Sequence, residues 1–334
     1  MSLPCQTDRV ANVLVLGGSG FVGRSLCEQL VTRNGGADGR ITVPSRRPQR
    51  AAHLRSLPTL DLVDANLHDD AQLAQLVAGR DAVVNLVAVL HGSEAEFEKA
   101  HVTLPRRLAA ACKAAGVRRV VHVSALGVTD DLGKTAPSRY LRSKTQGEQV
   151  LREAGLDLTL LRPSVIFGAH DRFINLFASL QAVFPLMPLA GAGARFQPVW
   201  VDDVARAIVA CLDTPSSISQ TIECTGPTQY SLADLVRLAG RWSGHVRPVL
   251  PLPAFAGRLQ ALLMECLPGE PLMSRDNLDS MRVANVASPG APSLATLATL
   301  GIAATAIESV MPAVLGHRAG VARLDPLRRG AGRA

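Results

Sequence analysis

A short apolar stretch that runs directly into a group of glycines limits the fold of this chain more than any other feature. Residues 12–16 are Asn-Val-Leu-Val-Leu, and residues 17–23 are Gly-Gly-Ser-Gly-Phe-Val-Gly. Residues 21–32 then place apolar side chains at helical spacing. We therefore predict a buried strand, a tight glycine turn and a helix in direct succession.

This order of elements predicts a loop that binds the pyrophosphate of a dinucleotide. Glycines let the backbone approach the phosphates closely, and the first N–H groups of the helix, together with its dipole, face them. A glycine motif alone is a weak signal, but the strand before it and the helix after it support this interpretation. The candidate pyrophosphate contacts are Gly17, Gly20, Phe21, Val22 and Gly23.

Strand-like and helix-like stretches alternate through the first half of the chain. Strands are predicted at residues 41–43, 60–64, 82–89, 119–124 and 158–161, and helices at residues 69–77, 93–115 and 138–153. Such alternation implies right-handed crossovers and a parallel sheet with helices on both faces. We predict the α/β class: a doubly wound parallel Rossmann sheet with a smaller, irregular C-terminal domain on the substrate side.

The expected domain boundaries follow the loss of this alternation. Proline and glycine become dense after residue 163, whereas residues 221–224 again resemble a strand of the main sheet. We expect an NAD(P)-binding Rossmann domain at residues 10–165 with 199–225 returning to it, a smaller substrate-side domain at 166–198 and 226–316, and a basic, disordered tail at 317–334.

The composition argues against several classes of partner. Five arginines and one aspartate give residues 317–334 a charge of +4 out of the total of +7, so the basic character lies mainly in the tail. Only 4% of the residues are aromatic, which leaves little for base stacking, and we expect no nucleic acid partner. Six scattered cysteines without a Cys-x-x-Cys pair predict a reduced, cytoplasmic setting and no metal site. Residues 1–10 lack the apolar core of a secretory signal.

Two long apolar stretches, residues 249–267 and 294–316, could be mistaken for membrane-spanning helices. Prolines and Arg258 interrupt the first, and the second contains Glu308 and Pro312. We therefore predict packed or surface helices rather than membrane spans. Peripheral attachment of the first stretch to the inner membrane stays open.

The residues that select the nucleotide are expected about 20 positions beyond the glycine loop, at the end of the second strand. Ser45, Arg46 and Arg47 stand there, with no acid for the ribose hydroxyls. Because serine and arginine can bind a 2′-phosphate through charge-assisted hydrogen bonds, NADP(H) is favoured over NAD(H). By position in the strand series, further contacts are expected from Asp64, Asn66 and Leu67 beside the adenine and from Ala88 beside the ribose and pyrophosphate.

Tyr140 and Lys144 lie four residues apart on a predicted helix and therefore share one face. A nearby ammonium group favours the phenolate, so we expect a lowered pKa of Tyr140 and a role in proton transfer. Lys144 can also hydrogen-bond a ribose. The pair is common by chance, but its position after a glycine loop and a strand series favours function.

The glycine loop and the Tyr-x-x-x-Lys pair resemble the short-chain dehydrogenase/reductase superfamily, in its extended or atypical branch. Three longer strings narrow the resemblance: Tyr-Leu-Arg-Ser-Lys at 140–144, Leu-Arg-Pro-Ser-Val-Ile-Phe-Gly at 161–168, and Phe-Gln-Pro-Val-Trp-Val-Asp-Asp at 196–203. They are similar to the nucleotide-binding accessory subunits of NADH:ubiquinone oxidoreductase (alpha subcomplex subunit 9) and their bacterial relatives. The resemblance covers residues 13–222, and more loosely extends to residue 315.

In catalytic members of this superfamily, a Ser or Thr after the fifth strand holds the substrate, the Tyr transfers a proton and the Lys supports it. The resemblance makes Ser124 the candidate here, although the hydroxyl usually comes one or two residues later, at Ala125 or Leu126. Either Ser124 acts from a shifted position or the triad is incomplete, and a missing donor lowers turnover about a hundredfold or more. The candidate catalytic residues are Tyr140, Lys144 and Ser124, and Tyr140, Lys144 and Pro163 are candidate cofactor contacts as well.

Two pairs of neighbouring residues have alternative interpretations. Asp202 and Asp203 precede a predicted helix at 204–212, which favours helix capping over catalysis. His170 and Asp171 lie near the nicotinamide end by analogy with the family, where a substrate role stays open.

Two functions remain open. The resemblance and the shifted serine favour an NAD(P)H-binding accessory or assembly factor linked to respiratory complex I or quinone metabolism, with a membrane complex or a quinone-pathway protein as its partner. Tyr140 and Lys144 favour an active NADP(H)-dependent oxidoreductase or epimerase/dehydratase acting on a small or isoprenoid substrate.

Overall fold

A computed structural model describes residues 10–35, 39–129, 131, 134–266, 271–288 and 294–316. These residues divide into two compact units, the first within Met1–Pro163, Val201–Cys224 and Gly290–Ala303, the second within Ser164–Trp200, Thr225–Pro289 and Ala304–Ala334. The predicted tail at 317–334 lies outside the described residues, as does nearly all of the amino-terminal stretch 1–10.

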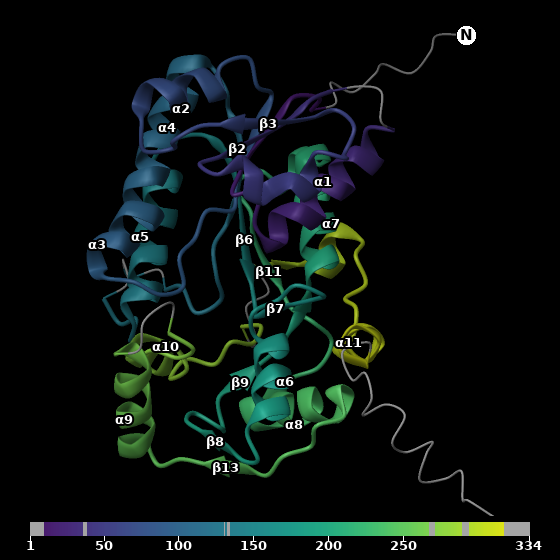
Figure 1. Cartoon of the computed structure of the whole chain (residues 1–334). Helices are drawn as coiled ribbons and strands as arrows, with labels where there is room; N and C mark the ends of the chain where they lie inside the picture. The colour runs from purple at the N-terminus through teal and green to yellow at the C-terminus, as the bar shows by residue number, and fades with distance from the viewer. Residues whose placement is uncertain are drawn as a thin grey trace, which may run out of the picture. The chain divides into compact units, whose positions relative to one another are not determined.

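The first unit contains an eight-stranded parallel sheet (Figure 1). Its order is β14-β11-β6-β5-β4-β1-β2-β3. The strands are β1 (Val13–Leu16), β2 (Ile41–Ser45), β3 (Leu60–Asp64), β4 (Ala82–Asn85), β5 (Arg119–Val123), β6 (Asp157–Pro163), β11 (Thr221–Cys224) and β14 (Ala295–Thr296). Because β1 pairs with β2 on one side and β4 on the other, the direction of winding reverses at β1, where such sheets bind ligands.

Helices cover both faces of this sheet, as predicted, and the α/β class is confirmed. Its helical elements are α1 (Phe21–Arg33), η1 (Pro48–Leu54), α2 (Asp70–Val77), α3 (Glu94–Glu98), η2 (Lys99–Thr103), α4 (Leu104–Ala115), α5 (Arg139–Arg152), α7 (Val201–Asp213), η3 (Pro215–Ser217) and η4 (Leu297–Leu300). Helices α1 and α7 pack together on one face, and α2, α4 and α5 lie together on the other (Figure 1).

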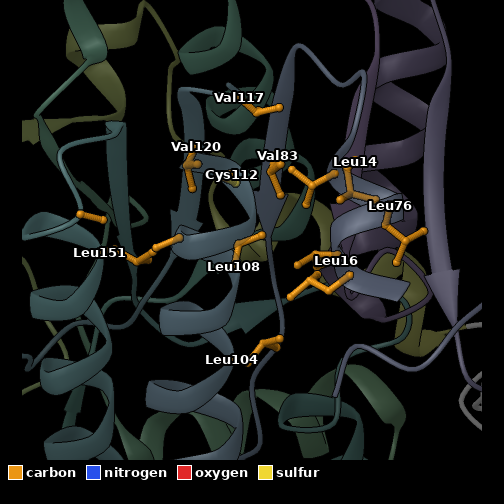
Figure 2. Close-up of a cluster of buried hydrophobic side chains, with 14 of the residues drawn as sticks. Leu14, Leu16, Leu76, Val83, Leu104, Leu108, Cys112, Val117, Val120 and Leu151 are labelled. Carbon is orange, nitrogen blue, oxygen red and sulfur yellow. The ribbon is translucent and has the colours of Figure 1, made fainter. Parts of the chain in front are cut away.

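The core between the sheet and the layer formed by α2, α4 and α5 is almost entirely aliphatic (Figure 2). Leu14 and Leu16 of β1 meet Leu104 and Leu108 of α4, and all four side chains are fully buried. Burying each leucine contributes about 1.5–3 kcal/mol, so this contact fixes β1 and its glycine loop firmly in the unit.

The second unit is irregular, as its proline and glycine content predicted. Among its described residues, three two-stranded ladders accompany a helical core. Its strands are β7 (Ile166–Phe167), β8 (Met187–Leu189), β9 (Arg195–Phe196), β10 (Val199–Trp200), β12 (Tyr230–Ser231) and β13 (Val249–Pro251). Its helices are α6 (Ile174–Val183), α8 (Leu232–Ser243), α9 (Ala254–Glu265), α10 (Arg275–Ser280) and α11 (Ile307–Gly316).

The structure departs from the sequence prediction in three places. The strand predicted at 82–89 ends at Asn85, because the chain leaves the sheet there to form a loop. The helix predicted at 93–115 is three segments, since Lys99–Thr103 forms a π-helical turn. β14 joins the sheet from Gly290–Ala303, which we had expected in the smaller domain. None of the helices in the described ranges is long and apolar enough to span a bilayer.

Candidate functional site

The glycine loop joins β1 to α1 at the carboxyl edge of the sheet. Gly17 has φ +79°, which favours glycine, and a Cβ there would lie 3.1 Å from the carbonyl carbon of Leu86. The N–H of Gly20 donates to the carbonyl oxygen of Gly17 at 3.0 Å. A Cβ on Gly23 would lie 2.4 Å from the Cα of Gly18. The turn and the close approach of α1 therefore both require glycine.

The amino terminus of α1 is suited to an anion. Its N-cap, Gly20, has no side chain that could cap the helix, and its first turn, which contains Phe21 and Val22, has no acidic residue. The first N–H groups and the positive end of the helix dipole can therefore be satisfied by phosphate oxygens.

The helix predicted at 204–212 is present as α7, but it begins at Val201, so Asp202 and Asp203 lie inside its first turn and do not precede it. Ser25 of α1 donates a hydrogen bond from Oγ to the Asp202 carboxylate. Asp203 is fully buried and forms an ion pair with Arg206. Both carboxylates have structural partners, which favours packing over catalysis.

The predicted nucleotide-selecting residues follow β2, which lies next to β1. The N–H of Arg47 donates to Ser45 Oγ at 3.2 Å, which turns the chain out of the strand. The side chains of Arg46 and Arg47 are exposed. Two arginines therefore follow directly after β2, the neighbour of the strand that leads into the glycine loop.

Further positive charge lies near Arg46. The pKa of His68 is lowered, first by burial and then by the charges of Lys99, Arg107 and Arg46. Arg107 also forms an ion pair with Asp70. Three cations therefore act on His68, and one of them, Arg107, is paired with Asp70.

The three residues assigned to adenine belong to the turn after β3. The N–H of Asn66 donates to Gln72 Oε1 at 2.8 Å, and its Oδ1 accepts from the N–H of His68 at 3.1 Å. Asp64 is exposed, and Leu67 packs on the aliphatic core. Asn66 shapes the turn, and an adenine contact by any of the three stays a prediction.

Two buried histidines hold the loop after β4. Asn85 Oδ1 accepts from the N–H of Val87 at 3.1 Å, and Asn85 Nδ2 contacts Nδ1 of His122 at 3.1 Å. Because the amide nitrogen is the donor, Nδ1 of His122 must be the acceptor. Ala88, the predicted ribose neighbour, is exposed at the centre of this loop.

His101, in the π-helical turn, ties the same loop to α5. Its Nε2 accepts from the N–H of Val89 at 3.1 Å, so in the neutral ring Nδ1 carries the proton and donates to Ser143 Oγ at 2.8 Å. Ser143 in turn donates to the carbonyl oxygen of Tyr140 at 2.9 Å. Burial, assisted by the charge of Lys144, lowers the pKa of His101 to about 3, which keeps the ring neutral.

Tyr140 and Lys144 both lie on α5, as predicted, but their electrostatics differ from the prediction. Burial raises the pKa of Tyr140 to about 12, so the expectation of a lowered pKa was wrong. The Tyr140 ring packs edge-on against His101, with the ring centroids 5.5 Å apart. Burial lowers the pKa of Lys144 to about 8, and its Nζ donates to the carbonyl oxygen of Val123 at 3.0 Å. Tyr140 is therefore held as a neutral phenol.

Ser124 follows the carbonyl that Lys144 binds. Its N–H donates to the carbonyl oxygen of Leu161 at 2.7 Å, and its buried Oγ has no hydrogen-bond partner within the described part of the chain. Leu126 donates from its N–H to the carbonyl oxygen of Pro163 at 3.1 Å, so this segment runs along the end of β6. A buried hydroxyl without a partner is costly, which makes Ser124 Oγ a candidate for a ligand contact.

Sequence reasoning missed a buried ion pair behind the site. Glu148, one turn after Lys144 on α5, accepts two hydrogen bonds from Arg162, at 3.0 and 2.7 Å. Both side chains are buried, and the charge of Glu148 raises the pKa of Lys144 against the effect of burial. The spacing of 140, 144 and 148 on one helix face was the signal that could have shown it.

Asp171, in the second unit, organises its own loop. Its carboxylate accepts hydrogen bonds from the N–H groups of Gly168, Phe173 and Ile174, at 3.2, 2.8 and 2.6 Å. Burial raises its pKa, and these hydrogen bonds oppose the rise. The pattern is that of a helix-initiating turn, whereas His170 is exposed.

The residues of the first unit fit a dinucleotide. The glycine turn, the uncapped start of α1, the arginines after β2 and the hydroxyl of Ser124 all follow strands at the carboxyl edge of one sheet. A sequence model of a family described as NAD(P)H-binding matches residues 17–215, more than half of the chain.

This protein belongs to the NAD(P)H-binding family.

Its relatives narrow the assignment. Over 282 residues the chain is 32% identical to the mitochondrial NADH dehydrogenase [ubiquinone] 1 alpha subcomplex subunit 9 of Mus musculus, covering 81% of this chain and 71% of that protein. It is 27% identical to the ceramide reductase of Caulobacter vibrioides, covering 74% of this chain and 75% of that one. The resemblance to the family of subunit 9 is thus confirmed, and this NAD(P)H-binding protein belongs to that family.

Solved structures confirm the fold. The UDP-glucuronic acid 4-epimerase of Bacillus cereus, in complex with UDP-glucuronic acid and NAD, superposes with a TM-score of 0.69 at 17% identity. The match covers 93% of this chain and 99% of the epimerase. This chain therefore has the same fold as this epimerase.

Proposed function

We propose that this protein binds NADP(H) as a nucleotide-binding accessory or assembly factor of respiratory complex I or of quinone metabolism. The observation that carries the proposal is the 32% identity to alpha subcomplex subunit 9 over 81% of this chain, and the raised pKa of Tyr140 agrees with it. The Tyr140 pKa of about 12 and the packing of its ring on a neutral His101 suit a side chain that holds structure around a nucleotide. Rapid acid–base chemistry favours a group whose pKa lies near the working pH.

The chain's own residues divide the work of binding. The loop from Gly17 to Gly23 and the first turn of α1 take the pyrophosphate. Lys144 and Ser124 lie at the end of β5, where an ammonium and a hydroxyl can donate to a ribose or a carbonyl. Bound NADP(H) would supply hydride chemistry, and the residues named here orient it and exclude water.

The preference for NADP(H) over NAD(H) rests on charge. Ser45 and Arg46 end the second strand without an acid, and Lys99 and Arg107 are near enough to act on His68 beside Arg46. A 2′-phosphate adds about two negative charges, which such a group of cations would bind. The 2′-hydroxyl of NAD(H) is uncharged and would gain little from these cations.

The partner is proposed from the relatives. Several proteins of this family are named as subunits of NADH dehydrogenase or NADH-ubiquinone oxidoreductase. We place this chain on a membrane complex of that kind, at the cytoplasmic side of an inner membrane.

One experiment tests the proposal. Protein is purified without added nucleotide, the bound small molecules are released and identified, and their exchange with labelled NADPH is followed. We expect near-stoichiometric NADPH that neither exchanges readily nor becomes oxidised. Tyr140→Phe should retain this NADPH, because binding does not require the phenol proton. Exchange between oxidised and reduced forms, with turnover lost in Tyr140→Phe, would overturn it.

A second function has observations of its own: an active reductase. Lys144 has a pKa of about 8, Ser124 Oγ has no described partner, and one relative is named a ceramide reductase. Such a reaction would transfer a hydride to a ketone carbon while Tyr140 donates its proton to the oxygen, giving an alcohol. NADPH oxidation with an apolar ketone, abolished in Tyr140→Phe, would establish it.

A further inference from the structure

Helix α9 of the second unit carries its apolar face outward. Gly257 and Ala261, one turn apart, are buried, and a Cβ on Gly257 would lie 2.7 Å from Cβ of Ala190. Gln260 Nε2 donates to the carbonyl oxygen of Pro188 at 3.2 Å. The small residues of α9 therefore pack on the segment that includes β8, and its large residues face away.

Four large apolar side chains form the outward face of α9. Their exposed fractions are 77% for Phe255, 57% for Leu259, 40% for Leu262 and 61% for Leu263. They lie opposite Gly257 on the helix, since the positions are spaced at the helical period. A surface helix normally buries such a stripe, so this outward face calls for a partner.

The second unit carries further exposed apolar side chains. Ten of the eleven exposed large hydrophobic residues found among the described positions belong to the second unit. Beside those of α9 they are Val183, Phe184, Leu186, Val246, Leu250 and Leu272. Leu186 directly precedes β8 and Leu250 lies in β13, its paired neighbour, from which the chain continues into α9 (Figure 1).

The segments that carry this surface have a net positive charge. Residues 172–201 and 235–264, which carry every one of these side chains except Leu272, contain six arginines and no acidic residue. Two of the six pair with acids outside these segments, Arg237 with Asp234 at 3.1 Å and Arg258 with Asp279 at 3.2 Å. The apolar stripe together with this net positive charge complements a surface that is apolar and negative.

We propose that the outward face of α9 docks on an anionic lipid bilayer, with the helix lying in the plane of the interface. A second copy of this chain is disfavoured, because a two-fold interface would bring segments of the same net positive charge against each other. An anionic bilayer supplies negative headgroups for the arginines and an apolar acyl region for the leucines. This docking is independent of the proposed nucleotide function, since every residue that carries it belongs to the second unit.

Vesicle flotation tests the proposal with the full chain. We expect binding to vesicles of phosphatidylcholine mixed with phosphatidylglycerol, weaker binding to phosphatidylcholine alone, and release by salt. The double variant Leu259→Ser, Leu263→Ser should lower the vesicle partition coefficient about tenfold or more for each leucine. Leu90→Ser, which removes a leucine 57% exposed in the first unit, is the matched control and should bind like the wild type.

A fluorescent probe reports the orientation of the helix. Cys266, the C-cap of α9, is an exposed free thiol seven residues after Leu259 and so lies on the same face. The fluorescence emission of an environment-sensitive dye on Cys266, in a Cys5→Ser background, should shift to the blue when anionic vesicles are added.

Three results would overturn the proposal. The first is a wild type that stays unbound with every vesicle, and the second is a dye that keeps its emission when the protein floats. The third is a wild-type dimer that dissociates in the double variant, which would assign the face to a second copy. Retained nucleotide in the double variant shows that it is folded, and keeps a failure here distinct from a failure of the nucleotide proposal.

Discussion

Lowering the pH from 6.5 to about 5 should destabilise this protein through its two buried histidines. The pKa of His101 falls from 6.5 to about 3 on folding, and that of His122 falls well below 6.5, in both cases mainly through burial. Both rings accept a hydrogen bond and stay neutral in the folded protein, whereas the unfolded chain binds a proton at each below about pH 6.5. The stability is therefore full above pH 6.5 and is lost as the pH falls.

The magnitude follows from proton linkage. A histidine protonated only in the unfolded chain costs about 1.4 kcal/mol per pH unit, so His101 alone removes about 2 kcal/mol between pH 6.5 and pH 5. His122, whose pKa is lowered by burial in the same direction, adds to this loss. Even about 2 kcal/mol is a large share of the 5–15 kcal/mol typical of a folded domain.

Urea unfolding at several pH values measures this loss, and His101→Gln isolates one histidine. The variant should lose about 1–3 kcal/mol at pH 7, because it breaks a buried hydrogen-bond chain. Its free energy of unfolding should then fall less steeply between pH 6.5 and pH 5 than that of the wild type, by about 1.4 kcal/mol per pH unit. His53→Gln, at an exposed position, is the control and should keep the full slope.

Equal slopes for His101→Gln and the wild type would refute the reasoning, because His101 would then titrate alike in the folded and unfolded chains. Carboxyl groups with a lowered pKa, such as Asp61 and Asp234, lose their stabilising effect only below about pH 4. Asp171, whose pKa is raised, contributes with the opposite sign. The difference between variant and wild type cancels all three.

Three further predictions concern the site. Gly23→Ala should weaken NADPH binding about tenfold or more in a fluorescence titration, because its Cβ would lie 2.4 Å from a backbone carbon of the same loop; Gly193→Ala, where the space is open, should not. Arg46→Ala should weaken NADPH binding about tenfold and leave NADH binding unchanged, and an equal loss for both would remove the 2′-phosphate assignment. Glu148→Gln should cost about 1–3 kcal/mol in thermal unfolding, since a neutral amide replaces the buried carboxylate that accepts two hydrogen bonds from Arg162; an unchanged melting temperature would contradict this.

The main outline of the first unit could be predicted from local patterns. The glycine loop, the parallel sheet and α5 with Tyr140 and Lys144 follow from periodicity and turn residues, which act over a few positions. The π-helical turn at His101 has no comparable signal, because it depends on α5 packing close by: a Cβ on Gly147 would lie 1.9 Å from the carbonyl oxygen of His101. β14 also has no local sequence signal, since two residues are too few to show a period.

The glycine loop and the Tyr140–Lys144 pair were determined by the sequence itself, because turn geometry and helical spacing are local properties. The sequence also located the apolar stretch that became α9. Only the tertiary structure decided the protonation states and the exposed face. The pKa of Tyr140 rises because distant segments bury it, against the local expectation from Lys144. The leucines of α9 face outward because Gly257 and Ala261 are the residues that fit beside Ala190. Burial sums contacts from the whole chain, and neither charge nor exposure can be read from one segment.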